Sequence, residues 1–301
     1  SHDWSYRSSI KGTTTMKFKQ LGIFSRVSVI WLCGVMFLVV FGQWIPLPQP
    51  TNFDIDAMGV GLFDSLKHPL GTDSNGYDLL SNVIRGARPS MLISLISVGI
   101  GGLIGSTLGI ISAYRRGKLD YIVNTLFNIV LSVPALVLGL ALVAVLATNP
   151  DPNIEVPTSR RVIVIILSLT IVIIPILGRI ARGATLSWSN REFVVAARSM
   201  GMKDSQIIMK HIVPNVLPAI YAVAFLAIGV VIVVEGSLSL LGVGIVDGVS
   251  WGSMIARVRG DLEFAPHSMI VPVVVLALTV IACNQLGDVL RSQLDSREGR
   301  L

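Results

Sequence analysis

Residues 216–234 read VLPAIYAVAFLAIGVVIVV, a run without a charged side chain. The hydrocarbon core of a bilayer is about 30 Å thick, so a helix that crosses it needs roughly 20 consecutive apolar residues. The run meets that length. It also lacks the alternating polarity of membrane β-strands, which are about ten residues long. The stretch therefore predicts a membrane-spanning α-helix.

Further uncharged runs of similar length occur along the rest of the chain. They cover residues 27–45, 89–114, 122–148, 162–178 and 269–287. A secretory signal peptide is the alternative for the first run. That run exceeds the usual length of about 7–15 apolar residues, however, and no small-x-small cleavage site follows it. The sequence therefore predicts an all-α integral membrane protein with six transmembrane helices.

The composition agrees with a membrane protein. Hydrophobic residues make up 52% of the chain and charged residues 14%, where a soluble domain has about 25% charged residues. The net charge of +6 does not indicate a nucleic-acid binder, because the basic residues separate apolar runs instead of gathering on one soluble face. Cys33 and Cys283 lie within apolar runs without metal-ligand spacing, and we interpret both as small core residues.

The distribution of Lys and Arg predicts the orientation. Positively charged flanks stay in the cytoplasm, and placing the N-terminus there puts most of the 24 Lys and Arg residues on cytoplasmic segments. Both termini are then cytoplasmic. The expected division is a tail 1–26, a first span 27–45, an extracytoplasmic loop 46–88, a permease core 89–290 and a tail 291–301. Within the core we expect a cytoplasmic loop 189–215 and an extracytoplasmic loop 235–268.

The cytoplasmic loop carries the signals of a first short helix. Ser189 and Glu192 have capping-box spacing, which satisfies free backbone donors at a helix start. Phe193, Ala197 and Met200 then fall on one helical face. Gly201 follows them, and glycine commonly ends a helix in the left-handed conformation.

A second short helix is expected from Asp204 to Pro214. It presents an apolar face with one histidine, made by Ile207, Ile208, His211 and Ile212. A pair of amphipathic helices between two spans has two physical uses, either lying among lipid headgroups or docking into a groove on a partner. The pattern alone leaves both open.

The amino-acid sequence of this loop resembles the EAA loop of binding-protein-dependent ABC importer permeases. Residues 191–198 read REFVVAAR, Gly201 follows, and residues 211–218 read HIVPNVLP. Residues 68–73 (HPLGTD), 235–244 (EGSLSLLGVG) and 250–252 (SWG) are similar to motifs of the same family. The resemblance covers roughly residues 24–297 and is strongest to the peptide and nickel branch, in its dipeptide/oligopeptide permease C-type members.

The resemblance implies a type I ABC importer permease fold whose cytoplasmic coupling helix docks on an ATPase subunit. It assigns ATPase coupling to Glu192, Phe193, Val195, Ala196, Ala197, Arg198, Gly201, Asp204, His211 and Pro214. Val195 stands where the motif usually has a glutamate, so a salt bridge from that position is missing. Tyr77 also departs from the family, at a position that often holds arginine.

The implied partners are a second homologous permease, two cytoplasmic ATPases, an extracytoplasmic binding protein and the lipid bilayer, and no nucleic acid. The chain has no Gly-x-x-x-x-Gly-Lys-Ser/Thr run, so ATP and Mg²⁺ are expected on the ATPase subunits. No cofactor or metal is expected on this chain, and it is expected not to be an enzyme.

For several other residues, a structural interpretation competes with a functional one. Gly101, Gly105 and Gly109 predict close helix packing, and Pro134 and Pro175 predict kinks. Glu235 is either an ion-coupling carboxylate, as acids within membranes often are, or a structural or gate-shaping residue at the end of the fifth span. We favour the second interpretation and extend it to Trp251.

The sequence predicts a peptide-importing permease subunit in the bacterial cytoplasmic membrane. Import of nickel or another small solute is the alternative within the family. A gradient-driven secondary transporter is the alternative from another class.

Overall fold

The structure is a computed structural model that describes residues 22–50, 52–147, 156–245, 249–260 and 262–298. Within these residues the regular structure is helical, apart from two isolated β-bridges that join Phe53 to Tyr77 and Thr72 to Asp78. Five of the described helices are long and apolar enough to cross a membrane. The count reaches six if one bent helix pair forms a single span. The all-α expectation is confirmed.

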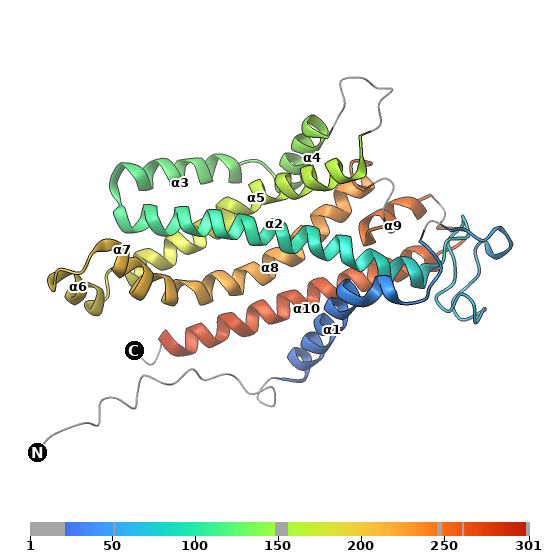
Figure 1. Cartoon of the computed structure of the whole chain (residues 1–301), viewed down its shortest axis with the longest axis horizontal. Coiled ribbons are helices and arrows are strands. Elements are labelled where there is room, and N and C mark those ends of the chain that lie inside the picture. Colours follow the sequence, from blue (N-terminus) through green and yellow to red (C-terminus); the bar gives the residue numbers. More distant parts are fainter. Residues whose placement is uncertain (1–21, 51, 148–155, 246–248, 261, 299–301) are drawn as a thin grey trace, which may run out of the picture.

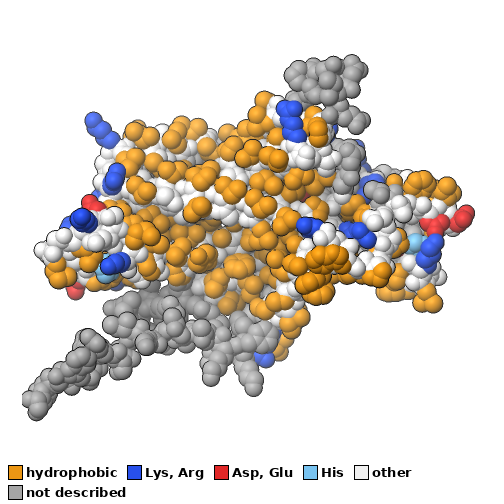
Figure 2. Space-filling view, in the orientation of Figure 1, with side chains coloured by type: hydrophobic (Ala, Val, Ile, Leu, Met, Phe, Trp, Pro, Cys, Tyr) orange, Lys and Arg blue, Asp and Glu red, His pale blue; other side chains and the backbone are white. Residues whose placement is uncertain are grey.

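The long helices run side by side along the length of the molecule (Figure 1). They are α1 (Ile23–Phe41), α2 (Leu79–Arg115), α5 (Thr158–Trp188), α8 (Val213–Leu240) and α10 (His267–Glu298). Figure 2 shows apolar side chains over most of the long flank, whereas the charged side chains gather mainly towards the two ends. This distribution suits a belt of lipid around the middle.

The expected third span is broken. It consists of α3 (Gly117–Leu131) and α4 (Ala135–Leu146), which are bent by 86° relative to each other. Pro134 stands directly before α4 and lacks the backbone N–H that would continue the helix. The kink predicted at Pro134 is therefore a break, and one continuous helix over 122–148 is wrong. By contrast, α5 continues through Pro175 as one helix.

Several helices extend beyond their apolar runs. Helix α2 begins ten residues before the run at Pro89, where the Asp78 side chain accepts a 2.7 Å hydrogen bond from the backbone N–H of Ser81. Helix α5 likewise runs on to Trp188. The predicted limits were too short because hydropathy marks the part of a helix that lies in hydrocarbon, while capping and packing continue the helix into water.

Helices α2 and α5 form the centre of the bundle. A Cβ added at Gly105 or Gly109 would collide with the carbonyl oxygens of Ile174 and Gly178 on α5, so these backbones touch. This confirms the helix packing predicted from the glycine spacing. The prediction for the cysteines was half right, because Cys283 is buried on α10 whereas Cys33 is exposed on α1.

The segment before α2 is tied to the end of the bundle. Nε2 of His267, at the start of α10, lies 2.8 Å from the carbonyl oxygen of Thr72. Arg257 on α9 (Trp251–Val258) lies 3.7 Å from the Asp73 carboxylate and stacks on the Tyr77 ring at 4.6 Å. The stacking gives the departure at Tyr77 a structural role. Figure 1 places this end opposite the short helices α6 and α7.

Candidate functional site

The candidate site is the segment between α5 and α8, and its first helix is α6 (Glu192–Ser199). The capping box predicted from Ser189 and Glu192 is wrong. Ser189 closes α5 instead, and its Oγ donates to the carbonyl oxygen of Leu186 at 3.2 Å. Arg191 occupies the N-cap of α6, and its guanidinium lies 5.3 Å from the centre of the Trp188 ring. The helix start is thus held by stacking on α5.

The end of α6 is a Schellman turn built on Gly201. The N–H of Met202 bonds to the carbonyl of Ala197 at 3.2 Å, and the N–H of Gly201 bonds to the carbonyl of Arg198 at 3.0 Å. Gly201 has φ of 79°, which confirms the predicted left-handed conformation. A Cβ at this position would meet no described atom within 4 Å. Glycine is therefore required here by backbone conformation and not by space.

The chain covers only part of the apolar face predicted for α6. Val194 and Ala197 face the core, whereas Phe193 is 42% exposed and Met200 is 78% exposed. The i, i+4, i+7 pattern selected residues of the right spacing but not the side that the fold covers. Val195, at the motif's glutamate position, is 55% exposed. Glu192 and Ala196 are exposed as well.

The second helix does not stop at Pro214. Helix α7 (Asp204–Ile207) begins at the predicted residue and continues through the π-helical residues Ile208–Ile212 into α8. The π-helical segment supplies wider turns directly before Pro214, and α8 accepts this proline in its first turn. On the predicted apolar face, Ile207 and Ile212 are buried, and Ile208 and His211 are partly buried. The segment is therefore an extension of the span α8.

Polar contacts attach this segment to the end of α2. The Tyr114 hydroxyl donates to Oδ1 of Asp204 at 2.8 Å, and the Arg198 guanidinium lies 5.3 Å from the centre of the same ring. The hydrogen bond with Tyr114 raises the pKa of Arg198 above its ordinary value. Arg116 Nη2 also donates to Oδ1 of Asn190 at 2.7 Å. These contacts join the α6 end of the molecule to the end of α2.

An aromatic row joins the two short helices. The Phe193 ring lies 6.2 Å from the Trp188 ring and 6.0 Å from the His211 ring, measured between centroids. Sequence reasoning included Phe193 and His211 but missed Trp188 and Tyr114. Trp188 directly precedes the predicted loop and therefore fell outside it. Tyr114 lies at the end of another span, 90 residues before Asp204, and no spacing rule links it to the loop. We name the residues 188–212 the α6–α7 segment.

Glu235 and Trp251 lie together at the opposite end, at the joint between α8 and α9. Glu235 does not close the span as predicted, since α8 runs on to Leu240. It is 1% exposed, and its Oε1 accepts hydrogen bonds from Ser239 Oγ at 3.1 Å and Ser250 Oγ at 2.9 Å. Within the described chain its Oε2 has no hydrogen-bond partner.

Trp251 fixes the start of α9 against α2. Its Nε1 donates to the carbonyl of Val83 at 3.0 Å, and its backbone N–H donates to Ser90 Oγ at 3.0 Å. Gly252 follows, and a Cβ there would lie 2.6 Å from Cα of Gly236 on α8. Glu235 and Trp251 thus belong to one tightly packed joint.

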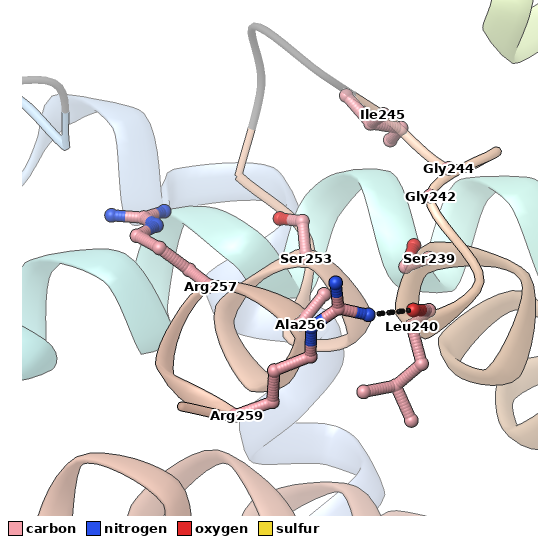
Figure 3. A pocket seen from close by; sticks show the side chains of 9 residues that line it. All are labelled: Ser239, Leu240, Gly242, Gly244, Ile245, Ser253, Ala256, Arg257 and Arg259. Atoms are coloured by element: carbon pink, nitrogen blue, oxygen red, sulfur yellow. Dashed lines mark hydrogen bonds between the residues drawn. The ribbon is translucent and has the colours of Figure 1, made fainter. Parts of the chain in front are cut away.

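A cavity of about 270 Å³ opens beside this joint. Figure 3 shows Arg259 reaching across it, with a guanidinium that donates to the carbonyl of Leu240 at 2.8 Å. Ser239 and Ser253 also line the cavity. Among the described residues no group of three or more His, Cys, Asp or Glu side chains is placed to hold a metal ion.

Comparisons with known proteins give a consistent result. Residues 105–300 match the family described as "Binding-protein-dependent transport system inner membrane component". The chain is 32% identical to the glutathione transport system permease protein GsiD of Pectobacterium atrosepticum, over 87% of this chain and 84% of that protein. It is 33% identical to GsiD of Shigella dysenteriae serotype 1, over 90% of this chain and 85% of that protein.

The fold also resembles a solved structure. An inward-facing structure of the MetNI methionine ABC transporter aligns with a TM-score of 0.58 at 21% sequence identity. The alignment covers 71% of this chain and 97% of that chain. At this identity the likeness concerns the fold.

Proposed function

This chain belongs to the family of binding-protein-dependent transport system inner membrane components and is a multi-span permease of an ABC importer, and from that premise we propose that it imports peptides. We further propose that the α6–α7 segment docks on an ATPase subunit. The chain itself catalyses no reaction in this proposal. ATP and Mg²⁺ are bound by two ATPases, and a homologous permease and an extracytoplasmic binding protein complete the assembly.

The observation that carries the docking proposal is the set of exposed apolar side chains on α6 and in the turn that follows it. Phe193 and Val195 are exposed on α6, and Met200 is exposed directly before the Gly201 turn, while Val194 and Ala197 pack against the bundle. Several exposed apolar side chains on one short helix suggest an interaction site. Val195 gives this surface apolar contact where a carboxylate would give an ion pair.

The anchoring contacts support transmission of force. Tyr114 joins the segment to α2, Trp188 joins it to α5, and α7 continues into α8. A displacement imposed on α6 by an ATPase would therefore reach three spans at once. Of the assigned coupling residues, Asp204, Arg198 and His211 take part in this anchoring, while Pro214 lies in the first turn of α8.

The peptide cargo rests on the relatives, which are named for glutathione, a peptide-like solute. The proposed orientation follows the charge distribution, with the α6–α7 segment and both termini in the cytoplasm and residues 46–78 outside. The membrane is then the bacterial cytoplasmic membrane.

Cross-linking tests the docking surface. In a chain carrying Cys33→Ala and Cys283→Ala, Met200→Cys should cross-link to an ATPase subunit in the assembled transporter. Val194→Cys is the matched control on the buried face of the same helix and should not. Cross-links from Met200→Cys to lipid alone would refute the docking proposal.

Transport in proteoliposomes tests the cargo. With the binding protein outside and MgATP available to the ATPases, we expect uptake of S-methylglutathione or tri-alanine, and ATP hydrolysis that rises when the binding protein is loaded. ATP-dependent uptake of Ni²⁺ with neither peptide transported would replace the peptide assignment. Proton-driven uptake by the chain alone would place it in the secondary-transporter class.

A further inference from the structure

Helix α3 has three distinct sides. The first side is buried: Val123 and Phe127 face the bundle, and the Phe127 ring lies where a Cβ on Gly178 of α5 would be. The second side is exposed and apolar, with Ile122, Leu126 and Ile129. The third side carries polar groups that are half or fully exposed, namely Asn124, Asn128 and Ser132.

The helical repeat separates the two exposed sides. At 3.6 residues per turn, Asn124, Asn128 and Ser132 form one stripe, and Ile122, Leu126 and Ile129 form another, centred roughly a third of a turn away. The polar stripe extends over about 12 Å along the helix axis. Both stripes cover the same depth in the membrane, so depth does not explain their different chemistry.

Lipid suits only one of these stripes. Ile122, Leu126 and Ile129 are soluble in hydrocarbon, whereas amide and hydroxyl groups exposed to hydrocarbon would lose their hydrogen bonds to water. Polar side chains inside a membrane face the protein interior or a water-filled path. The polar stripe therefore faces a different medium from the apolar stripe.

The break after α3 also indicates that this part of the helix faces water or protein instead of lipid. Ser132, Val133 and Pro134 are exposed at the break, about 22 Å along the axis from Gly117. The N–H groups of Ser132 and Val133 still bond to carbonyls at the end of α3, but the first N–H groups of α4 have no intrahelical partner. Exposed non-helical backbone at membrane depth is tolerated only where it is covered by protein or lines a water-filled cavity.

Arg179 adds an orienting contact to the stripe. It lies on α5, is exposed, and donates from its guanidinium to Oδ1 of Asn128 at 2.5 Å. Arginine offers only donors, so the Asn128 oxygen must face it and the Asn128 NH₂ group is directed elsewhere. The stripe thus offers amide donors and acceptors and a hydroxyl beside one positive charge.

We propose that Asn124, Asn128 and Ser132, with Arg179, line the aqueous translocation path and contact the transported peptide. The inference rests on the proposed import of peptides and names residues of that path. Side-chain amides and hydroxyls bind the peptide backbone, which is common to all peptides, and Arg179 favours a carboxylate. The path then accepts varied side chains with a preference for anionic peptides.

Thiol labelling tests this placement in the assembled transporter. In the Cys33→Ala, Cys283→Ala chain, single cysteines are introduced as Asn124→Cys, Asn128→Cys and Ser132→Cys. The matched controls are Ile122→Cys, Leu126→Cys and Ile129→Cys, at the same depths on the apolar stripe. A water-soluble methanethiosulfonate reagent should modify the first set at least about tenfold faster than the second.

Two outcomes overturn the inference. Equal rates for both sets would show that the polar stripe is no more hydrated than the lipid-facing one. Slow labelling of all six, with disulfides from the polar set to a cysteine in the partner permease, would place the stripe in a subunit interface. Stimulation of ATP hydrolysis by the loaded binding protein is measured on each variant, so a failed importer assignment is distinguished from a failed path assignment.

Discussion

Helices α6 and α9 are each eight residues long, lie at opposite ends of the molecule and differ in their surroundings. Helix α6 buries only Val194 and Ala197. Helix α9 buries five residues, which are Trp251, Gly252, Met254, Ile255 and Val258. The difference indicates that other parts of this chain cover most of α9, whereas α6 presents a surface that the chain does not cover.

The glycines of the two helices make the same distinction. At Gly252 an added Cβ would meet the backbone of α8, while at Gly201 it would meet no described atom within 4 Å. Gly252 is required by close packing, and Gly201 is required by its positive φ. Substitutions at the α9 end should therefore lower the stability of the bundle, and those at the α6 end should affect coupling more than stability.

The largest effect is expected from Trp251→Ala. The side chain is 1% exposed, and its Nε1 donates a hydrogen bond to the carbonyl oxygen of Val83. Truncation to alanine should therefore lower the free energy of unfolding by about 3–5 kcal/mol. The midpoint of thermal unfolding in detergent measures this loss. Phe264→Ala, at an exposed position on the same end, is the control and should leave the midpoint unchanged. Equal midpoints for both variants would contradict a closed α9 joint.

A smaller loss is expected from Gly252→Ala. The new methyl group would lie 2.6 Å from Cα of Gly236, so α8 and α9 must separate, at a cost of about 1–3 kcal/mol. The same assay reports the change, with Gly260→Ala as the control, because a Cβ there meets no described atom within 4 Å. An unchanged midpoint for Gly252→Ala would mean that the two helices are not held in contact.

At the other end, Gly201→Val should separate transport from ATP hydrolysis. A β-branched residue with positive φ costs about 1–2 kcal/mol, a factor of about 5–30 in the population of the native turn. Peptide uptake per ATP hydrolysed should fall by a similar factor while membrane insertion is retained. Gly201→Asn tolerates the left-handed conformation and should transport nearly normally. Full transport by the valine variant would contradict the proposed coupling role of this turn.

The comparison also shows which features a sequence can reveal. Apolar runs identified every long helix, and Gly201 identified the turn, because each depends on residues that are close together in the chain. The side of α6 that faces the core could not be predicted, since Phe193 and Val194 are both apolar. Their burial is decided by Tyr114, Ile207 and Val216 on other helices.

The joint between α8 and α9 also depends on contacts that the local sequence does not reveal. The sequence predicted Glu235 at the end of the span because the uncharged run ends there, yet α8 continues to Leu240. Two serines supply its hydrogen bonds, and one of them, Ser250, is fifteen residues away. The break at Pro134 was anticipated only as a kink, because the local pattern does not report an angle of 86° between its helices.

A modest effect is expected from Tyr114→Phe. The change removes the hydroxyl that bonds to Asp204 and Arg198 and keeps the ring beside Arg198, so the segment should lose at least about 0.5–1.5 kcal/mol of attachment to α2. Hydrogen exchange of the α6 backbone should accelerate about 2- to 13-fold. Tyr121→Phe, at an exposed position on α3, is the control. Equal exchange in Tyr114→Phe and the native chain would show that the contact does not hold the segment.

The smallest effect concerns a surface pair in the segment before α2, between Lys67 and Asp54. The hydrogen bond with Lys67 lowers the pKa of Asp54 below its ordinary value of 3.8, so the unfolded chain protonates first as the pH falls. The stabilisation is present above pH 3.8 and is lost as the pH falls through the lowered pKa. Lys67→Met should therefore unfold at a slightly lower temperature than the native chain at pH 7. That difference should shrink below about pH 4, because protonated Asp54 no longer attracts Lys67. A difference that stayed constant down to pH 2 would assign the effect of Lys67 to packing instead of charge.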